Sequence, residues 1–314
     1  MDFKYIFGPV MSSRLGRSLG LDLLGAKICD FDCLYCEVGR TRMHTAVRDV
    51  YVSGDLILEE LALWFEQGHT RPGYITLGGM GEPCLNTETG RIIGEVKRFC
   101  PDIPVAVLTN SSLLHLSEVR RELSLADAVL PSLDTVVEEE FLRLNRPCPG
   151  VGLSNLLEGL LAFRREYTGR IFLETLLVPG YNDSEQNLHG LRDFCSRLSP
   201  DRHDLTRMTR PGSYIRAPKT DPELEGKWRE LLGLDIASID SGEDQSHGPD
   251  KGGRLDPETV LASLRRRPQT VEQLAFALGG GIPDIAAELE RLRRRERVRA
   301  DRDLNTDKIF FSVR

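Results

Sequence analysis

Short apolar runs alternate with amphipathic segments through residues 19–205, and this alternation restricts the fold more than any other feature of the chain. The apolar runs predict strands at 19–24, 74–77, 105–108, 128–130 and 171–177, with a further strand near Leu205. The segments between them predict helices at 55–67, 87–99, 117–123, 135–144, 153–167 and 184–198. Strands separated by helices are typical of βαβ units with a parallel sheet. About six such units predict an α/β fold, a partial (βα)6 barrel with too few strands to close as an eight-stranded barrel does.

A change in composition marks the end of this α/β body. Residues 241–254 read SGEDQSHGPDKGGR, rich in glycine and charge and free of apolar periodicity, as in a flexible linker. We therefore expect a barrel domain at 1–240, a linker at 241–254 and a small domain at 255–314. The tail from Asp250 onward carries a net charge of +3 and the rest of the chain −10, so an acidic body carries a mildly basic tail.

The small domain has helix and strand signals of its own. Asp256 is an N-cap residue followed by proline, and Thr270 begins a capping box. Pro283 opens a third helix that runs to about Arg294. Two strands follow, at 297–303 and 308–313. Three helices and a hairpin resemble a winged-helix domain, which implies binding to nucleic acid, to a peptide or to its own enzyme.

Three of the seven cysteines stand close together near the start of the chain. Three residues separate Cys29 from Cys33, and two separate Cys33 from Cys36. Cysteine thiolates are soft ligands that hold iron–sulfur clusters, and three on one loop can bind three irons of a [4Fe–4S] cluster and leave the fourth iron open. A structural zinc site is the nearest alternative, although it needs four ligands.

The chain carries no sign of export or of membrane insertion. Its opening residues contain no apolar run long enough for a signal peptide, so a disulfide framework is disfavoured. No stretch of eighteen or more apolar residues occurs either. We expect reduced thiols, no membrane contact and a cytoplasmic location.

The CxxxCxxC spacing resembles the signature of the radical S-adenosylmethionine (radical SAM) superfamily. The resemblance implies that the open iron is chelated by the amino and carboxylate groups of SAM, which is reductively cleaved to a 5′-deoxyadenosyl radical. A second motif, Gly-Gly-Met-Gly-Glu-Pro at 78–83, follows the strand at 74–77 and is similar to the GxGEP element that binds the SAM amino group in these enzymes. Both motifs follow strands, at the end where active sites lie in this architecture.

The resemblance assigns roles to residues that match the family's motifs. Cys29, Cys33 and Cys36 are the expected cluster ligands, and Tyr35 is expected to stack on the adenine. The residues expected to bind the methionyl amine of SAM are Gly79, Gly81 and Glu82. Ser132 and Asn182 are further candidates, for the SAM carboxylate and for the ribose or adenine. Three arginines, Arg143, Arg146 and Arg210, are candidates for an anionic substrate or the SAM carboxylate, with surface salt bridges as the alternative.

The four remaining cysteines are scattered, and most of them are expected to be small buried hydrophobes. Cys84 adjoins the glycine-rich turn, and Cys148 lies in a Pro-Cys-Pro loop. These two are candidate hydrogen donors to a substrate radical.

The opening segment at 7–20 and the strand-end residues are similar to one branch of the superfamily, the wyosine-synthase-like iron–sulfur oxidoreductases, many of them uncharacterised. The likeness covers about residues 3–215. Wyosine-base synthases act on tRNA and build a second cluster from additional N-terminal cysteines, but this sequence has no cysteine before Cys29. The substrate therefore stays open among RNA, a peptide and a small metabolite, although the acidic body argues mildly against RNA.

We expect a radical SAM enzyme whose radical abstracts hydrogen from an unidentified substrate and whose electron donor is a protein such as flavodoxin or ferredoxin. The alternative is an iron–sulfur sensor whose cluster state controls nucleic-acid binding by the tail.

Overall fold

The structure is a computed structural model, and it describes residues 3–12, 14–218, 221–234, 256–303 and 307–313. The predicted linker at 241–254 and both domain boundaries lie outside the described residues. The proposed division of the chain at these points stays a prediction.

Among the described residues, one seven-stranded sheet forms the centre of the body. Its strands follow one another across the sheet in chain order: β1 (Ile6–Ser12), β2 (Gly16–Leu21), β5 (Tyr74–Leu77), β6 (Val105–Thr109), β7 (Ala128–Pro131), β8 (Arg170–Leu177) and β9 (Arg202–Arg207). Strand β1 pairs antiparallel with β2, and the six strands from β2 to β9 are parallel. The predicted α/β partial (βα)6 barrel is confirmed.

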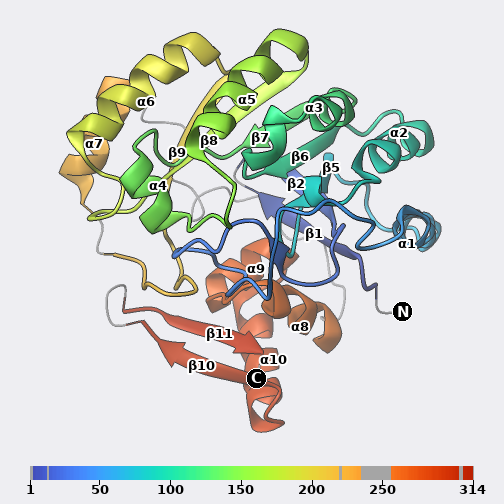
Figure 1. Ribbon diagram of the computed structural model, residues 1–314. Coiled ribbons are helices and arrows are strands. Elements are labelled where there is room, and N and C mark those ends of the chain that lie inside the picture. Colours follow the sequence, from blue (N-terminus) through green and yellow to red (C-terminus); the bar gives the residue numbers. More distant parts are fainter. Residues whose placement is uncertain (1–2, 13, 219–220, 235–255, 304–306, 314) are drawn as a thin grey trace.

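Helices connect the parallel strands or, in the case of α7, follow the last of them, and they lie along the outer side of the sheet (Figure 1). They are α1 (Gly54–Glu66), α2 (Thr89–Phe99), α3 (Ser117–Leu123), α4 (Glu138–Leu144), α5 (Leu153–Glu166), α6 (Glu185–Leu198) and α7 (Pro222–Leu232). Two short 3-10 helices, η1 (Pro83–Leu85) and η2 (Ser112–His115), follow β5 and β6. Successive strand side chains point to opposite faces, so Val105 and Val107 join the main core while Ala106 joins a separate, smaller apolar cluster.

The C-terminal elements enclose a second hydrophobic core, which includes Leu261, Leu274, Leu289 and Val298. They are three helices, α8 (Pro257–Arg266), α9 (Val271–Leu278) and α10 (Ile282–Arg294), followed by the antiparallel strands β10 (Val298–Arg302) and β11 (Ile309–Val313). This is the order that the sequence predicts. The assignment to the winged-helix class stays a prediction. Helices α8 and α9 lie against β1, next to the sheet (Figure 1).

The first predicted strand is shifted, for a local reason. It spans Gly16–Leu21 and ends before Asp22, whereas the apolar run continues to Leu24. The Asp22 carboxylate accepts hydrogen bonds from the backbone N–H of Leu24 at 3.2 Å and of Met80 at 3.4 Å. An aspartate that bonds its own backbone two residues on forms a turn, and this turn directs the chain toward the cysteines.

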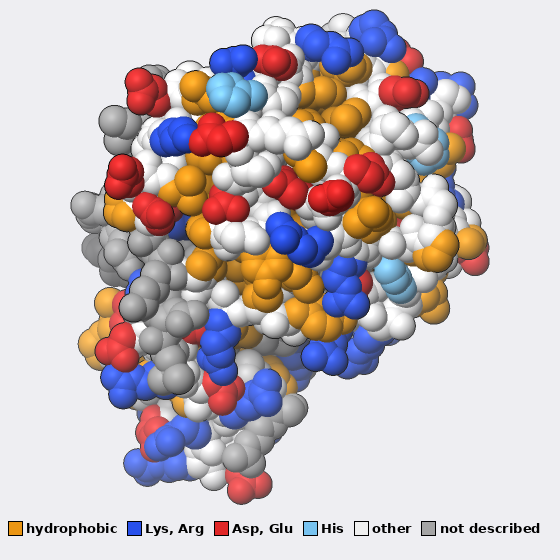
Figure 2. Space-filling view, turned by 60° about the vertical axis from the view of Figure 1, so that its left-hand side comes forward, with side chains coloured by type: hydrophobic (Ala, Val, Ile, Leu, Met, Phe, Trp, Pro, Cys, Tyr) orange, Lys and Arg blue, Asp and Glu red, His pale blue; other side chains and the backbone are white. Residues whose placement is uncertain are grey.

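Figure 2 shows basic and acidic side chains intermingled, both over the C-terminal elements at the bottom and over the body. Across the described residues, we find no helix that combines the length and the apolar character needed to span a membrane.

Candidate active site

The parallel strands end at one edge of the sheet, and polar groups follow several of these ends. A loop with the three cysteines (residues 22–45, the cysteine loop) follows β2, and a glycine-rich turn (residues 78–83, the glycine turn) follows β5. Asn110 follows β6, Asp134 follows β7 and Arg210 follows β9. A cavity of about 1600 Å³ opens at this edge and is lined by residues of both motifs. The architecture therefore brings the two predicted motifs to one place.

Backbone hydrogen bonds hold the cysteine loop in shape. Its short strands β3 (Ile28–Cys29) and β4 (Met43–His44) pair in parallel. The N–H of Cys36 donates to the carbonyl of Cys33 at 3.2 Å, which forms a tight turn between the last two cysteines. The N–H of Leu34 donates to the carbonyl of Leu144 at 2.9 Å and ties the loop to the end of α4. All three cysteines are free thiols that line the cavity.

Two amide side chains lie beside the sulfurs. The Nδ2 of Asn110 is 3.7 Å from the Sγ of Cys29, and the Nδ2 of Asn145 is 3.7 Å from the Sγ of Cys33. Burial, followed by the charge of Asp30, raises the pKa of Cys29 well above its usual range, and burial also raises the pKa of Cys33. A buried thiol stays protonated unless positive charge compensates the thiolate, which is what a bound metal supplies.

This donor set fits an iron–sulfur cluster. The described residues contain no group of three or more His, Cys, Asp and Glu side chains placed to hold a metal ion. In a [4Fe–4S] cluster, however, each cysteine binds a different iron, so the three sulfurs approach from separate corners and do not converge on one ion. Hydrogen bonds to cluster sulfurs tune such sites, and Asn110 and Asn145 occupy suitable positions.

Close backbone approach explains the glycines of the glycine turn. The N–H of Gly78 donates to the carbonyl of Leu21 at 3.1 Å, and the N–H of Glu82 donates to the carbonyl of Ile28 at 3.2 Å. A Cβ atom on Gly81 would lie only 1.7 Å from that Ile28 oxygen. Gly79 adopts a φ of +141°, which favours glycine. The turn thus packs directly against the backbone next to Cys29, and Gly79, Gly81 and Glu82 all line the cavity.

Glu82 is buried and already accepts three hydrogen bonds. Its Oε1 accepts from the N–H of Cys84 at 3.1 Å and the hydroxyl of Thr109 at 2.8 Å, and its Oε2 accepts from the N–H of Asn110 at 2.6 Å. Burial, together with the charge of Asp30, raises the pKa of Glu82 to about 7. These hydrogen bonds join the ends of β5 and β6. Because a carboxylate has about four lone-pair positions, Glu82 can still accept a hydrogen bond from one further donor.

Tyr35 belongs to a buried network centred on Asp134. Its hydroxyl donates to Oδ2 of Asp134 at 2.5 Å, and Nδ2 of Asn145 donates to the same oxygen at 2.8 Å. The N–H of Leu176 donates to Oδ1 of Asp134 at 3.0 Å. These bonds link the cysteine loop to the ends of β7 and β8 and fix the orientation of Tyr35, which lines the cavity.

Ser132 and Asn182 occupy different environments. Ser132 lines the cavity, and its carbonyl accepts from the hydroxyl of Ser111 at 2.9 Å. Asn182 is fully buried and does not occur among the described residues that line the cavity. Its amide donates to the carbonyls of Asp134 and Leu176 at 2.8 and 2.9 Å, and its Oδ1 accepts from the N–H of Val178 at 2.7 Å. The structure therefore gives Asn182 a scaffolding position behind the site.

Neither candidate hydrogen donor reaches the cavity lining among the described residues. Cys84 is buried, with its Sγ 3.5 Å from Oγ1 of Thr109. Cys148 is buried as well, and its N–H donates to the carbonyl of Asp30 at 2.8 Å. Of the three candidate arginines, Arg210 lines the cavity, whereas Arg143 contacts the ring of Tyr181 and Arg146 that of Tyr214.

The C-terminal elements also line the cavity, which the sequence analysis did not anticipate. Arg267, at the end of α8, pairs with Glu37 of the cysteine loop, and Gln273 of α9 accepts a hydrogen bond from Arg210 at 2.9 Å. Arg14, in the turn between β1 and β2, pairs with Glu174 of β8. These partners are far apart in the sequence; Arg210 is one of the arginines that the sequence analysis names for an anionic substrate or the SAM carboxylate, whereas Arg14 and Arg267 were missed.

Sequence comparisons find relatives across most of the chain. A GTPase Obg of Brachyspira hyodysenteriae is 33% identical over 306 residues, which cover 95% of this chain but only 44% of that protein. A UPF0026 protein of Synechocystis sp. is 35% identical, over 72% of this chain and 81% of the relative. A UPF0026 protein of Methanocaldococcus jannaschii is 34% identical, over 72% of each chain. The chain spans less than half of the Obg protein, and its sequence has no GxxxxGK(S/T) phosphate-binding loop.

Solved structures share the fold at low sequence identity. TYW1 with a lysine–pyruvate adduct bound aligns with a TM-score of 0.52 and 15% identity, over 72% of this chain and 75% of that one. Streptococcus suis SuiB bound to precursor peptide SuiA aligns with a TM-score of 0.51 and 15% identity, over 68% and 46%. The family model described as "Radical SAM superfamily" matches residues 24–191, which include the cysteine loop from residue 24 onward and the whole glycine turn. Because that match covers more than half of the chain, the chain belongs to the radical SAM superfamily, enzymes whose cofactors are a [4Fe–4S] cluster and SAM.

Proposed function

We propose that this chain binds a [4Fe–4S] cluster through Cys29, Cys33 and Cys36 and uses it to cleave SAM reductively. When bound, the cluster and SAM would supply a 5′-deoxyadenosyl radical, which abstracts a hydrogen atom from a substrate in the same cavity. The observation that carries the proposal is that three free thiols and the glycine turn line one cavity at the C-terminal ends of the parallel strands.

The chain's own residues would bind and orient SAM. Gly79 and Gly81 leave room for a ligand close to the backbone, and Glu82 can accept a hydrogen bond from the methionyl ammonium group. Tyr35, held by Asp134, would stack its ring on the adenine. Ser132 lies on the cavity wall, where its hydroxyl can bind a polar group of SAM.

Asn182 would act indirectly, without touching SAM. Its bonds to the ends of β7 and β8 support Asp134 and, through it, Tyr35. Cys84 and Cys148 are the candidate hydrogen donors; both thiols lie outside the described cavity lining, so either would act after SAM cleavage and only if the segment that carries it moved. The electron for SAM cleavage would come from a small redox protein such as flavodoxin or ferredoxin.

The activity can be tested under anaerobic conditions. The protein is reconstituted with iron and sulfide, dithionite and SAM are added, and 5′-deoxyadenosine is measured by chromatography. We expect the wild type to form 5′-deoxyadenosine and a Cys33→Ala variant to form none. A Cys195→Ala variant is the matched control, because Cys195 lies on α6 and its thiol faces His203.

Wild-type protein that holds a stable cluster but cleaves no SAM would contradict the proposal. That result would favour the sensor alternative, and the affinity of the C-terminal domain for DNA would then be measured. At present no contact or charge in the described structure favours the sensor over the enzyme. The C-terminal elements line the cavity, which fits a role in binding the enzyme's own substrate.

A further inference from the structure

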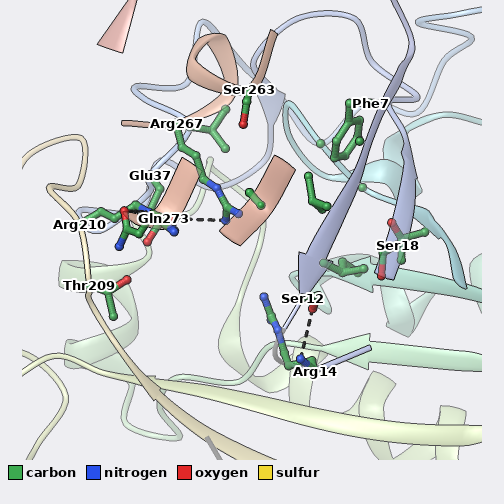
Figure 3. Close-up of a pocket in the computed structure, with 18 of the residues that line it drawn as sticks. Phe7, Ser12, Arg14, Ser18, Glu37, Thr209, Arg210, Ser263, Arg267 and Gln273 are labelled. Carbon is green, nitrogen blue, oxygen red and sulfur yellow. Dashed lines mark hydrogen bonds and ion pairs between the residues drawn. The ribbon is translucent and has the colours of Figure 1, made fainter. Parts of the chain in front are cut away.

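The arginines that line the cavity include three, Arg14, Arg210 and Arg267, from widely separated parts of the chain. Arg14 comes from the turn after β1, Arg210 from the segment after β9, and Arg267 from the end of α8. Figure 3 shows Arg210 and Arg267 gathered with Glu37 and Gln273 on one side of the cavity, with Arg14 entering from the β1–β2 turn. The fold thus assembles a basic group that no local sequence pattern contains.

Positive charge exceeds negative charge within this group. Arg210 and Arg267 share one carboxylate oxygen, Oε2 of Glu37, at 2.8 and 3.6 Å, and Arg14 pairs with Glu174. Three guanidinium groups are therefore matched by two carboxylates. Each guanidinium has five N–H donors in a planar fork that suits carboxylate and phosphate oxygens.

The arginines are close enough to repel one another and are still reachable from the cavity. Burial lowers the pKa of Arg267 to about 10, and the charges of Arg210 and Arg14 add to this effect against the opposing influence of Glu37. Arg267 nevertheless remains charged at neutral pH. Its side chain is 36% exposed, that of Arg14 is 25% exposed, and that of Arg210 is 13% exposed. A bound anion would relieve this repulsion and accept the remaining donors.

The positions of these arginines separate them from the part of the chain that carries the cofactor motifs. The family model matches residues 24–191, and all three arginines lie outside it. The body as a whole is acidic, with a net charge of −10 before residue 250. A local positive site in an acidic protein is suited to a particular ligand and not to general attraction of polyanions.

We propose that Arg14, Arg210 and Arg267 bind the phosphate or carboxylate group of a small-molecule substrate. This inference deepens the proposed function and rests on it, because the bound anion is a substrate only if the chain is the proposed enzyme. A small molecule is favoured over a polymer because the Arg267–Glu37 and Arg210–Gln273 contacts hold α8 and α9 over the cavity. A nucleic acid or a long peptide would have to break these contacts to enter.

The test measures binding of inorganic phosphate to the reconstituted 314-residue chain by isothermal titration calorimetry, without reductant. We expect Arg267→Gln and Arg210→Gln each to raise the Kd for phosphate by about tenfold or more, since each removes a charged donor. Glu37→Gln removes a competing carboxylate and is expected to lower the Kd, a change that partial unfolding cannot imitate. Arg192→Gln is the control, because Arg192 pairs with its neighbour Asp193 on α6.

Phosphate binding that is equal in the wild type and both cavity arginine variants would overturn the inference. So would competition between phosphate and SAM, which would assign the arginines to the SAM carboxylate. Binding of an RNA oligonucleotide that depends on Arg267, in protein that binds no phosphate, would overturn the small-molecule assignment. Failure of the proposed function would give a different result. Phosphate binding that depends on the arginines, in protein that forms no 5′-deoxyadenosine, would contradict the SAM chemistry but still support the anion site.

Discussion

Replacing Gly81 with alanine is expected to damage both the fold and the cofactor site, because the two meet at this residue. A Cβ atom at position 81 would lie 1.7 Å from the carbonyl oxygen of Ile28, and real Cβ contacts essentially never fall below 3.0 Å. The backbone would have to separate by more than an ångström to relieve the clash. That movement would break the hydrogen bond from the N–H of Glu82 to Ile28 and displace the start of the cysteine loop.

The expected loss of stability in Gly81→Ala has two parts. A buried backbone group left without its partner costs about 1–3 kcal/mol, and forcing an extra carbon into a packed site costs about 1–3 kcal/mol more. We expect Gly81→Ala to lower the free energy of unfolding by about 2–6 kcal/mol. For a chain of this size each kcal/mol corresponds to roughly 2–4 °C in Tm.

Gly78→Ala is the matched control in the same turn. A Cβ atom there would meet Leu108 at 3.5 Å, an ordinary contact, and the backbone has no positive φ. Urea unfolding of the cofactor-free proteins compares the stabilities, and iron and sulfide analysis after reconstitution compares the sites. If Gly81→Ala matched Gly78→Ala within about 0.5 kcal/mol and held as much iron, the close-approach argument would be refuted.

Three further predictions concern single residues. Because folding raises the pKa of Glu82 to about 7, its contribution to stability is present below its usual pKa and is lost as the pH rises through 7. Urea unfolding of the cofactor-free protein between about pH 5 and pH 8 should therefore show that the free energy of unfolding falls more steeply in wild type than in Glu82→Gln. Equal slopes in the two proteins would contradict this. Asn182→Ala should destabilise the protein by about 2–4 kcal/mol in urea unfolding, since it removes three buried hydrogen bonds, whereas a loss below about 1 kcal/mol would disprove the scaffolding role. Cys84→Ala should keep 5′-deoxyadenosine formation within about twofold of wild type, because its thiol lies outside the cavity lining; a tenfold loss, about 1.4 kcal/mol of barrier, would show that it acts on the chemistry.

The repeating part of the fold could be predicted because each unit carries its own local signal. The strand at Tyr74–Leu77 was placed at its observed bounds, and its neighbours in the sheet follow in chain order. Parallel strands end at one edge, so motifs after β2 and β5 had to meet. Strand β1 was missed because Gly8-Pro9 interrupts its alternation and shifts its pairing register between Phe7 and Val10. Helix α7 was also missed, although Asp221 caps its start and Gly233 its end.

The site itself could be predicted only where a motif carries it. The cysteines and the glycine turn meet in the cavity, but the sequence shows neither that Glu82 is already bound by three donors nor that Asn182 lies behind the site. Both facts depend on how the strand ends come together: the donors to Glu82 include Thr109 and Asn110 at the end of β6, and Asn182 bonds to backbone groups after β7 and at the end of β8. The pairing of Arg267 with Glu37 joins residues more than two hundred positions apart, and no local pattern encodes such a contact.

The central claim is that three cysteines hold a cluster with one iron left open for SAM. Electron paramagnetic resonance of the reduced, reconstituted protein tests it most directly, with spectra recorded before and after SAM is added. We predict the signal of a reduced [4Fe–4S] cluster whose g values shift when SAM binds, and loss of that signal in Cys29→Ala, Cys33→Ala and Cys36→Ala. A cluster signal that SAM leaves unchanged, or one that survives any of these substitutions, would contradict the account.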